Sequence, residues 1–368
     1  MTQNAALFSP VQMGALDLPN RVLMAPLTRN RAQGDGTPKA MAVPYYRQRA
    51  SAGLIFTEAT QISAMGKGYL DTPGIYTEAQ VTAWKKVTDA IHAAGGRVFL
   101  QLWHVGRISH SSLLPDGRAP LSASAIRADA QTFTANGFED CSTPDAMTEV
   151  QITQTLAEYR HAAKSAKEAG FDGIEVHAAN GYLLDQFLQD GSNHRDDAYG
   201  GSIENRMRFL QEVLDVVGEI WSPDRTGVRL SPLGQANDIS DTDPETLFAA
   251  VIEMLDSRKL AYLHMVEAFP GSTPNDDDSA LIDRLRQLWS GFYIANGGYE
   301  AQSASDAITS GTADAVTFGR PFIANPDLPE RFRIGAKLNE PDADTFYGGD
   351  ETGYTDYPFM DHPADKVA

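Results

Sequence analysis

Residues 173–187 bring an imidazole, an amide and a phenol close together in the sequence. An apolar run ends at His177, and Asn180 and Tyr182 follow within five positions, before a helical pattern begins. Such groups can bind a carbonyl-type oxygen and deliver a proton. In a β/α barrel, the point where a strand gives way to a helix lies on the catalytic face. This stretch is therefore the first candidate site, although an isolated His or Tyr is more often a hydrogen-bonded structural residue.

A second candidate site follows two later apolar runs, where glycines and an arginine occur together. Gly297 and Gly298 follow one run, and Gly319 and Arg320 follow the next. Glycines let backbone N–H groups approach a phosphate closely, and a guanidinium pairs with phosphate oxygens. The loops after strands seven and eight often bind phosphate in barrels. Alone, each pair is more simply a tight turn or a surface ion-pair former; together at adjacent strand ends they favour phosphate.

Two polar side chains occur inside apolar runs rather than after them. A buried cation such as Arg229 is costly unless it meets an anion or strong acceptors. Arg229 could stabilise negative charge on a cofactor ring, or it could form a structural salt bridge with a carboxylate such as Glu175; the sequence leaves both interpretations open. Gln101 could hydrogen-bond an amide-like edge, although a plain core hydrogen bond is the simpler interpretation.

The elements that must position these groups alternate between strands and helices. Eight short apolar runs predict strands buried on both faces, as in parallel sheets; they are 21–24, 54–57, 98–102, 173–176, 227–230, 262–266, 292–295 and 315–318. Helical patterns lie between them, at 40–51, 77–94, 148–169, 203–220, 244–258, 278–289 and 301–310. This α/β alternation predicts a single (β/α)8 TIM barrel over residues 1–368. A doubly wound sheet is disfavoured because no Gly-x-Gly-x-x-Gly follows the first strand.

Two segments are too long to be ordinary connections. Residues 105–147 lack helical periodicity, which predicts a lid or binding loop with a hairpin over the barrel mouth, residues 127–133 being part of it. Residues 339–368 are rich in Asp, Pro, Gly and Tyr and predict an irregular C-terminal tail. Left-handed helix caps are expected at three glycines, Gly53, Gly95 and Gly170.

Composition excludes several classes of protein. Lys and Arg number 30 against 49 Asp and Glu, a net charge of −19, which disfavours binding to nucleic acids and to membrane surfaces. The single cysteine, Cys141, excludes intrachain disulfides, iron–sulfur clusters and Cys-rich zinc sites. No apolar run has the length of a membrane span, and no basic segment followed by an apolar stretch opens the chain. We expect a soluble, cytoplasmic protein.

Longer motifs spread along almost the whole chain resemble the old yellow enzyme family of FMN-dependent ene-reductases. In order they are NRVLMAPLTR (20–29), QLWHVGR (101–107), GIEVHAANGYLLDQF (173–187), AYGGSIENR (198–206), FYGG (346–349) and GYTDYP (353–358). One subgroup of the family has Cys where this chain has Thr28, so the resemblance is to the other subgroup.

The resemblance implies a non-covalently bound FMN and no metal. Thr28 would bond the O4 side of the flavin ring, Gln101 its pyrimidine edge, and Arg229 the region of N1 and O2, where reduced flavin carries negative charge. The residues that the resemblance implies for FMN binding are Pro26, Leu27, Thr28, Ala59, Gln101, His177, Arg229, Gly297, Gly298, Gly319 and Arg320.

The resemblance also implies the reaction. NADPH or NADH would reduce the flavin and leave, and an α,β-unsaturated carbonyl, nitroalkene or maleimide would take its place. His177 and Asn180 would bind the oxygen of the activating group, hydride would pass from flavin N5 to the β-carbon, and Tyr182 would protonate the α-carbon. The pocket would be lined by Tyr69, Trp103, Phe269 and Tyr347. A monomer or weak homodimer acting on small molecules is expected.

Three other functions of a barrel stay open at this point. A metal-dependent hydrolase could use His177 and His264 with carboxylates, although no His-x-His follows the first strand. A Schiff-base aldolase needs a strand-end lysine, and no predicted strand contains lysine. A non-catalytic barrel that binds a phosphorylated ligand would hold FMN without oxidising NADPH with any acceptor.

Overall fold

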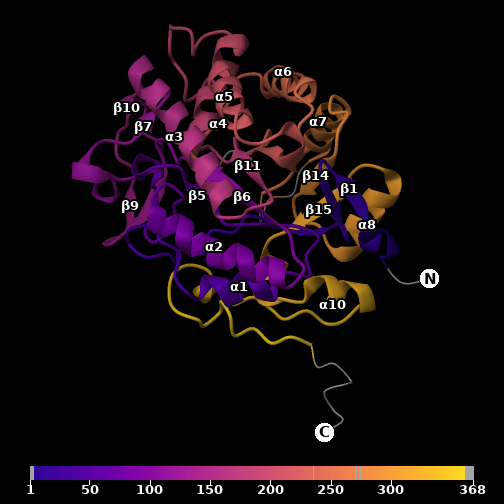
Figure 1. Cartoon of the computed structure of the whole chain (residues 1–368). Helices are drawn as coiled ribbons and strands as arrows, with labels where there is room; N and C mark the ends of the chain where they lie inside the picture. The colour runs from indigo at the N-terminus through magenta and orange to yellow at the C-terminus, as the bar shows by residue number, and fades with distance from the viewer. Residues whose placement is uncertain (1–3, 235, 270–271, 273–274, 361–368) are drawn as a thin grey trace.

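Eight parallel strands close into one barrel, so the predicted (β/α)8 fold is confirmed. The computed structural model describes residues 4–234, 236–269, 272 and 275–360 (Figure 1). β15 pairs with β3, and β6 pairs with β11, which closes the sheet. The barrel strands are β3 (Val22–Met24), β4 (Ile55–Phe56), β6 (Val98–Trp103), β11 (Gly173–His177), β12 (Thr226–Leu230), β13 (Tyr262–Val266), β14 (Tyr293–Asn296) and β15 (Ala315–Phe318).

Helices surround the barrel, and each long one lies close to its predicted range (Figure 1). They are α1 (Ala42–Gln48), α2 (Glu78–Ala93), α3 (Glu149–Glu168), α4 (Leu183–Leu188), α5 (Ile203–Gly218), α6 (Pro244–Ser257), α7 (Asp276–Gln287), α8 (Ala301–Ser310), α9 (Arg320–Ala324) and α10 (Leu328–Ile334). Thr77 and Gln80 form a capping box at α2, as Thr148 and Gln151 do at α3. No helix among the described residues is long and apolar enough to cross a membrane.

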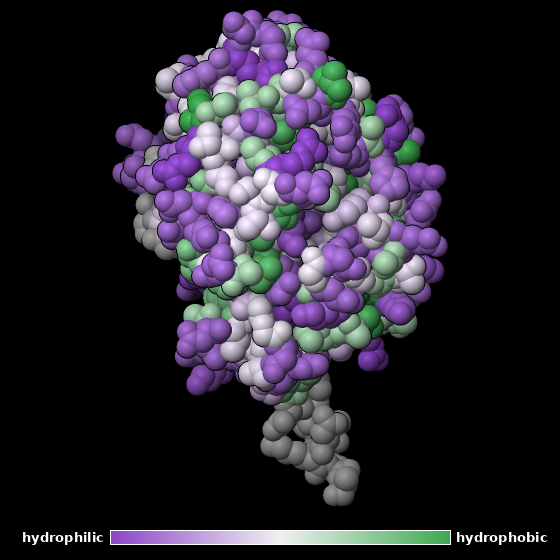
Figure 2. Space-filling view, turned by 90° about the vertical axis from the view of Figure 1, so that its left-hand side faces the viewer, coloured by the Kyte–Doolittle hydropathy of each residue, from purple (hydrophilic) through white to green (hydrophobic). Residues whose placement is uncertain are grey.

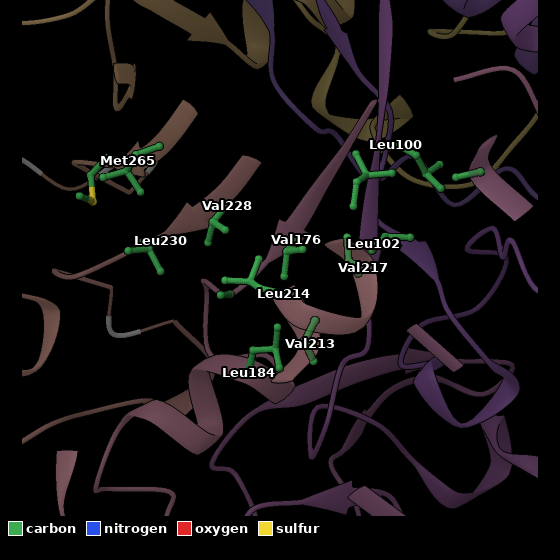
Figure 3. Close-up of a cluster of buried hydrophobic side chains, with 14 of the residues drawn as sticks. Leu100, Leu102, Val176, Leu184, Val213, Leu214, Val217, Val228, Leu230 and Met265 are labelled. Atoms are coloured by element: carbon green, nitrogen blue, oxygen red, sulfur yellow. The ribbon is translucent and has the colours of Figure 1, made fainter. Parts of the chain in front are cut away.

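Alternation along the strands separates an outward apolar face from an inward face that carries polar side chains toward the carboxyl ends of the strands. The outward side chains of β6, β11, β12 and β13 belong to one buried apolar cluster with residues of α4 and α5. Figure 3 labels Leu100, Leu102, Val176, Val228, Leu230, Met265, Leu184, Val213, Leu214 and Val217 of this cluster. Successive side chains of a strand point to opposite faces. The residues between these apolar ones, Gln101, Glu175, His177, Arg229 and His264, therefore point into the barrel.

The amino-terminal end of the barrel is closed by an apolar plug. A hairpin of β1 (Val11–Met13) and β2 (Leu16–Leu18) packs Met13, Leu16 and Leu18 in one cluster with the inward rings of Phe56, Phe99 and Tyr262. Because the plug closes this end, the barrel is open at the opposite end, where the carboxyl ends of the strands lie.

The long segment after β6 contains short strands, and the predicted hairpin is displaced along the chain. β8 (Gln131–Thr134) and β9 (Gly137–Asp140) form the hairpin, so only the end of the expected 127–133 lies in it. The Leu70 N–H donates to the Phe133 carbonyl at 2.9 Å, which holds β8 beside residues 68–70. The remaining strands are β5 (Thr60–Gln61), β7 (Leu121–Ser122) and β10 (Asp145–Ala146).

Two of the three predicted glycine caps are confirmed, and of the predicted irregular tail 339–368 the last eight residues, 361–368, lie outside the described residues. Residues 339–360 contain one short 3-10 turn, η7 (Ala343–Thr345), and the tail lies on the same side as α1 (Figure 1). Gly95 and Gly170 have φ of 80° and 83°. The prediction for Gly53 is wrong: its φ is not positive, and glycine is needed there because a Cβ would lie 2.1 Å from the Asn20 carbonyl oxygen.

Candidate active site

His177 and Asn180 lie at the open end of β11 with polar atoms that have no protein partner. The Asn180 backbone has φ of 61° and is held at both ends: its N–H donates to the Ser231 hydroxyl at 2.7 Å, and its carbonyl accepts from the Asn237 amide at 2.8 Å. His177 Nδ1 and Asn180 Oδ1 are buried without a hydrogen bond to any described residue. Since buried polar groups are normally paired, these atoms indicate a ligand site.

Tyr182 forms an aromatic wall with three other rings at this end of the barrel. Its ring stands edge-on to Trp103 and to His177, with centroids 5.1 Å and 5.2 Å apart. Tyr69 stacks on Trp103, and its hydroxyl lies 3.2 Å from that of Tyr182. Burial raises the pKa of Tyr182. The phenol is therefore protonated at neutral pH and can donate a proton.

Burial and positive charge keep His177 neutral. Desolvation is the largest effect, and the cationic Arg229 on the neighbouring strand adds to it, so the pKa of His177 lies well below 6.5. A neutral imidazole carries one N–H and one acceptor nitrogen. His177 can thus donate a hydrogen bond to an oxygen without carrying charge.

The salt-bridge alternative for Arg229 is wrong. Its Nη2 donates to Asn296 Oδ1 at 2.8 Å, while Glu175 accepts from Gln101 and lies against His264. Arg229 Nε is buried without a hydrogen-bond partner among the described residues. Burial lowers the pKa of Arg229 and Glu175 opposes the effect, but guanidinium groups remain charged in proteins. A cation with an unpaired N–H thus lies beside His177.

The two glycine segments lie side by side after β14 and β15. Ala295 pairs with Val316, which sets the residues that follow each strand next to one another. Gly298 has φ of 71° and open space where a Cβ would stand. A Cβ on Gly297 would lie 2.7 Å from the Ala268 backbone nitrogen, so no larger residue fits there. Arg320 is exposed and forms no ion pair with the part of the chain that the structure describes.

The segment after β3 lies between these two parts of the site. Pro26, Leu27 and Thr28 are half-buried, and the Leu27 side chain lies 3.3 Å from the position of a Cβ on Gly319. Ala59, which follows β4, packs in one cluster with Trp103. These contacts place the segment after β3 beside Gly319, and Ala59 beside the aromatic residues around Trp103.

Phe269 and Tyr347 are the two predicted pocket residues that are least enclosed. The half-buried Phe269 ring packs against Gly234, whose Cβ would stand 2.7 Å from it. Tyr347 is 67% exposed, and its phenol adds to the effects that raise the pKa of Tyr182.

Sequence reasoning missed the residues that hold the predicted ones in place. Ser231, Asn237 and Asn296 each bond a site residue, and His264 bonds Glu175. These four residues share one sequence signal, which is a polar residue within a strand or soon after it. That signal predicts that the residue lies at the open end of the barrel, but it does not predict which residue it bonds.

Comparison with known proteins identifies the family. The chain matches the model of the NADH:flavin oxidoreductase / NADH oxidase family over residues 6–339. It is 44% identical to 12-oxophytodienoate reductase 1 of Oryza sativa subsp. japonica over 361 residues, 96% of this chain and 93% of that protein. It is 41% identical to 12-oxophytodienoate reductase 2 of Arabidopsis thaliana over 369 residues, 98% of each.

Solved structures agree with the sequence comparison. Morphinone reductase superposes with a TM-score of 0.94 at 50% identity, over 98% of both chains. The old yellow enzyme homologue from Zymomonas mobilis superposes with a TM-score of 0.93 at 43% identity, over 96% of this chain and 99% of that one. The chain therefore belongs to the NADH:flavin oxidoreductase family, that of the old yellow enzymes, and is an FMN-dependent NAD(P)H oxidoreductase.

Proposed function

We propose that this enzyme reduces C=C bonds activated by a carbonyl or a similar acceptor group, at the site of His177, Asn180 and Tyr182. The observation that carries the proposal is a neutral His177 whose Nδ1 has no hydrogen-bond partner among the described residues, edge-on to the protonated phenol of Tyr182. The amide of Asn180 follows three residues later with its oxygen unpartnered, so this amide is free to turn its N–H toward a ligand. Several relatives are named as reductases of 12-oxophytodienoate and of morphinone, compounds with oxo groups by name. Those names support an electrophilic alkene with a carbonyl as the substrate class.

The residues present fit FMN. Arg229 offers an unpaired buried N–H beside His177, and Gly298 and the exposed Arg320 leave room and charge for a phosphate. Pro26, Leu27, Thr28, Ala59 and Gln101 would hold the ring between these ends. When bound, FMN accepts hydride from NAD(P)H and supplies it to the substrate.

His177 and Asn180 bind and polarise the substrate oxygen in this proposal. Two N–H donors, one from each side chain, draw electron density from the alkene and stabilise the negative charge that develops on that oxygen. The left-handed Asn180 backbone, bonded to Ser231 and Asn237, fixes the position of the second donor.

Tyr182 provides the proton that the α-carbon needs. Its hydroxyl is oriented by Tyr69 at 3.2 Å, and its ring is held edge-on between Trp103 and His177. Because burial raises its pKa, the phenol keeps its proton until the α-carbon becomes basic.

A Tyr182→Phe variant tests the proposal. It should leave the rate of flavin reduction by NADPH within about twofold, but slow turnover of a simple enone by roughly 10²- to 10⁴-fold, the range for loss of a general acid. Stopped-flow measurements of the two half-reactions separate these effects. Tyr69→Phe, which removes a hydroxyl from the same wall but not the donor, should slow the enone less. Unchanged enone turnover in Tyr182→Phe would remove Tyr182 from this role.

A further inference from the structure

A chain of polar side chains crosses the barrel interior, and only its Gln101 end has a role in the proposed function. Glu175, Gln101, His264 and Thr317 point inward from four strands, and each is at most 2% exposed. The Gln101 amide nitrogen donates to Glu175 Oε1 at 2.8 Å. Nδ1 of His264 lies 2.8 Å from Glu175 Oε2, and its Nε2 lies 2.9 Å from the Thr317 hydroxyl. A carboxylate is costly to bury, so its presence calls for a role.

Glu175 determines which end of the Gln101 amide faces the cofactor site. A carboxylate only accepts hydrogen bonds, so the amide nitrogen of Gln101 turns toward it. Gln101 and Glu175 are directly paired residues of β6 and β11, which keeps this contact in register. The amide oxygen is then left as an acceptor. The pyrimidine edge of a flavin carries one N–H, at N3, between two carbonyl oxygens. An amide oxygen complements that N–H, whereas a flipped amide would set donor against donor.

Glu175 also places a negative charge inside the barrel that no directly bonded cation neutralises. Gln101 is neutral, and burial lowers the pKa of His264 more than Glu175 raises it, so the imidazole is neutral too. Nδ1 then donates to Glu175, and Nε2 accepts from Thr317. The nearest cationic strand neighbour is Arg229, whose pKa Glu175 raises against the effect of burial, without forming an ion pair with it.

We propose that Glu175 is a positioning residue for the flavin: its carboxylate fixes the Gln101 amide with the oxygen toward the ring, and its charge lowers the reduction potential of bound FMN. Reduction adds negative charge to the flavin, which a nearby carboxylate in a medium of low dielectric constant opposes. The inference rests on the proposed placement of the ring at Gln101 and Arg229.

Glu175→Gln tests the charge with little change of shape. The new amide oxygen can accept from Gln101, and its N–H can donate to His264 Nδ1 once the imidazole proton moves to Nε2. The midpoint potential of the holoenzyme should therefore rise. The expected rise corresponds to a roughly tenfold increase in the affinity of the protein for reduced FMN relative to oxidised FMN. Spectrophotometric titration against redox dyes measures it. A potential that is unchanged or lower would overturn the proposal.

Glu175→Leu tests whether the hydrogen bond from Gln101 to Glu175 helps to hold FMN. It also provides a second measurement of the effect of the charge if Glu175→Gln does not fold. It removes charge and acceptor together, so the potential should rise as well and Gln101 should lose its fixed orientation. FMN release on dilution of the holoenzyme, followed by flavin fluorescence, should be about tenfold faster than from the wild type, the value of one hydrogen bond. Release at the wild-type rate, with an unchanged potential, would contradict both parts of the role.

Thr317→Val is the matched control. It removes the far end of the same polar chain but leaves Glu175 and Gln101 in contact, so its potential should equal that of the wild type. If it shifts the potential as much as Glu175→Gln does, the carboxylate has only a structural role and the proposal is wrong. None of these measurements uses an alkene. An enzyme that binds FMN but reduces no enone would disprove the proposed function without deciding this inference.

Discussion

His177 and Asn180 are the two residues on which substrate binding is expected to depend most directly. Replacing either with Ala should weaken binding of a phenol-type ligand that places its oxygen at the site, by about tenfold, because one hydrogen bond is lost. Titration of the flavin absorption spectrum measures the dissociation constant. His161→Ala, which removes an exposed histidine of α3, should bind like the wild type. Equal affinity in all variants would contradict the pair assignment.

His104 should make the protein sensitive to acid. Histidine in an unfolded chain has a pKa of about 6.5, whereas burial lowers the pKa of His104 to about 3. Between these values the unfolded chain binds one proton more, so the folded state loses stability as the pH falls. The wild type should lose free energy of unfolding relative to His104→Asn, by about 1.4 kcal/mol for each pH unit below about 6.5. Urea unfolding of both proteins from pH 7 to pH 5 measures it; a constant difference would refute the argument.

At the scale of elements, the loop after β12 supports the end of β11. Asn237 donates to the Asn180 carbonyl, and Arg107 forms an ion pair with Asp238 at 3.7 Å, which holds the loop in place. Asn237→Ala should raise the dissociation constant of the same phenol-type ligand about threefold to tenfold, because Asn180 loses one of its two backbone anchors.

The rate of flavin reduction separates this effect from general damage. Asn237→Ala should change that rate less than it changes ligand affinity. Asn136→Ala, an exposed amide in the β8–β9 turn, serves as the matched control and should alter neither. Wild-type affinity in Asn237→Ala would show that Asn180 does not depend on the loop.

Sequence predicted the elements well because their signals are local. The strand ending at His177 and the helices beginning at Thr77 and Thr148 follow from apolar periodicity and capping residues within a few positions. Asn237 and Asn180 are 57 residues apart, and Glu175 and His264 are 89 apart. Such partners are brought together only by the closing of the barrel, so no local pattern could pair them.

At the scale of the whole molecule, buried arginines and tyrosines hold the C-terminal tail against α1 and the segment after β3. Arg29 Nε donates to the Phe346 carbonyl at 2.8 Å, and the Gly348 N–H donates to the Arg29 carbonyl at 2.9 Å. Both neighbours of Tyr347 are thus held by one residue near β3. Tyr354 stacks on Tyr45 with ring centroids 3.9 Å apart, and the guanidinium groups of Arg29 and Arg31 lie 5.1 Å and 4.7 Å from the centroid of its ring.

Tyr354→Ala should therefore loosen the tail and the pocket edge together. Tyr354 is 1% exposed, so the lost ring and its cation–π contacts should lower the free energy of unfolding by about 3 kcal/mol. Proteases should cut residues 339–360 sooner, and the phenol-type ligand should bind less tightly as Tyr347 loses its support. Phe359→Ala removes a ring of the same tail that is 49% exposed, and it should change none of these. If Tyr354→Ala destabilises the fold while ligand affinity stays at the wild-type value, the tail stabilises the barrel without shaping the site, and Tyr347 is not part of the pocket.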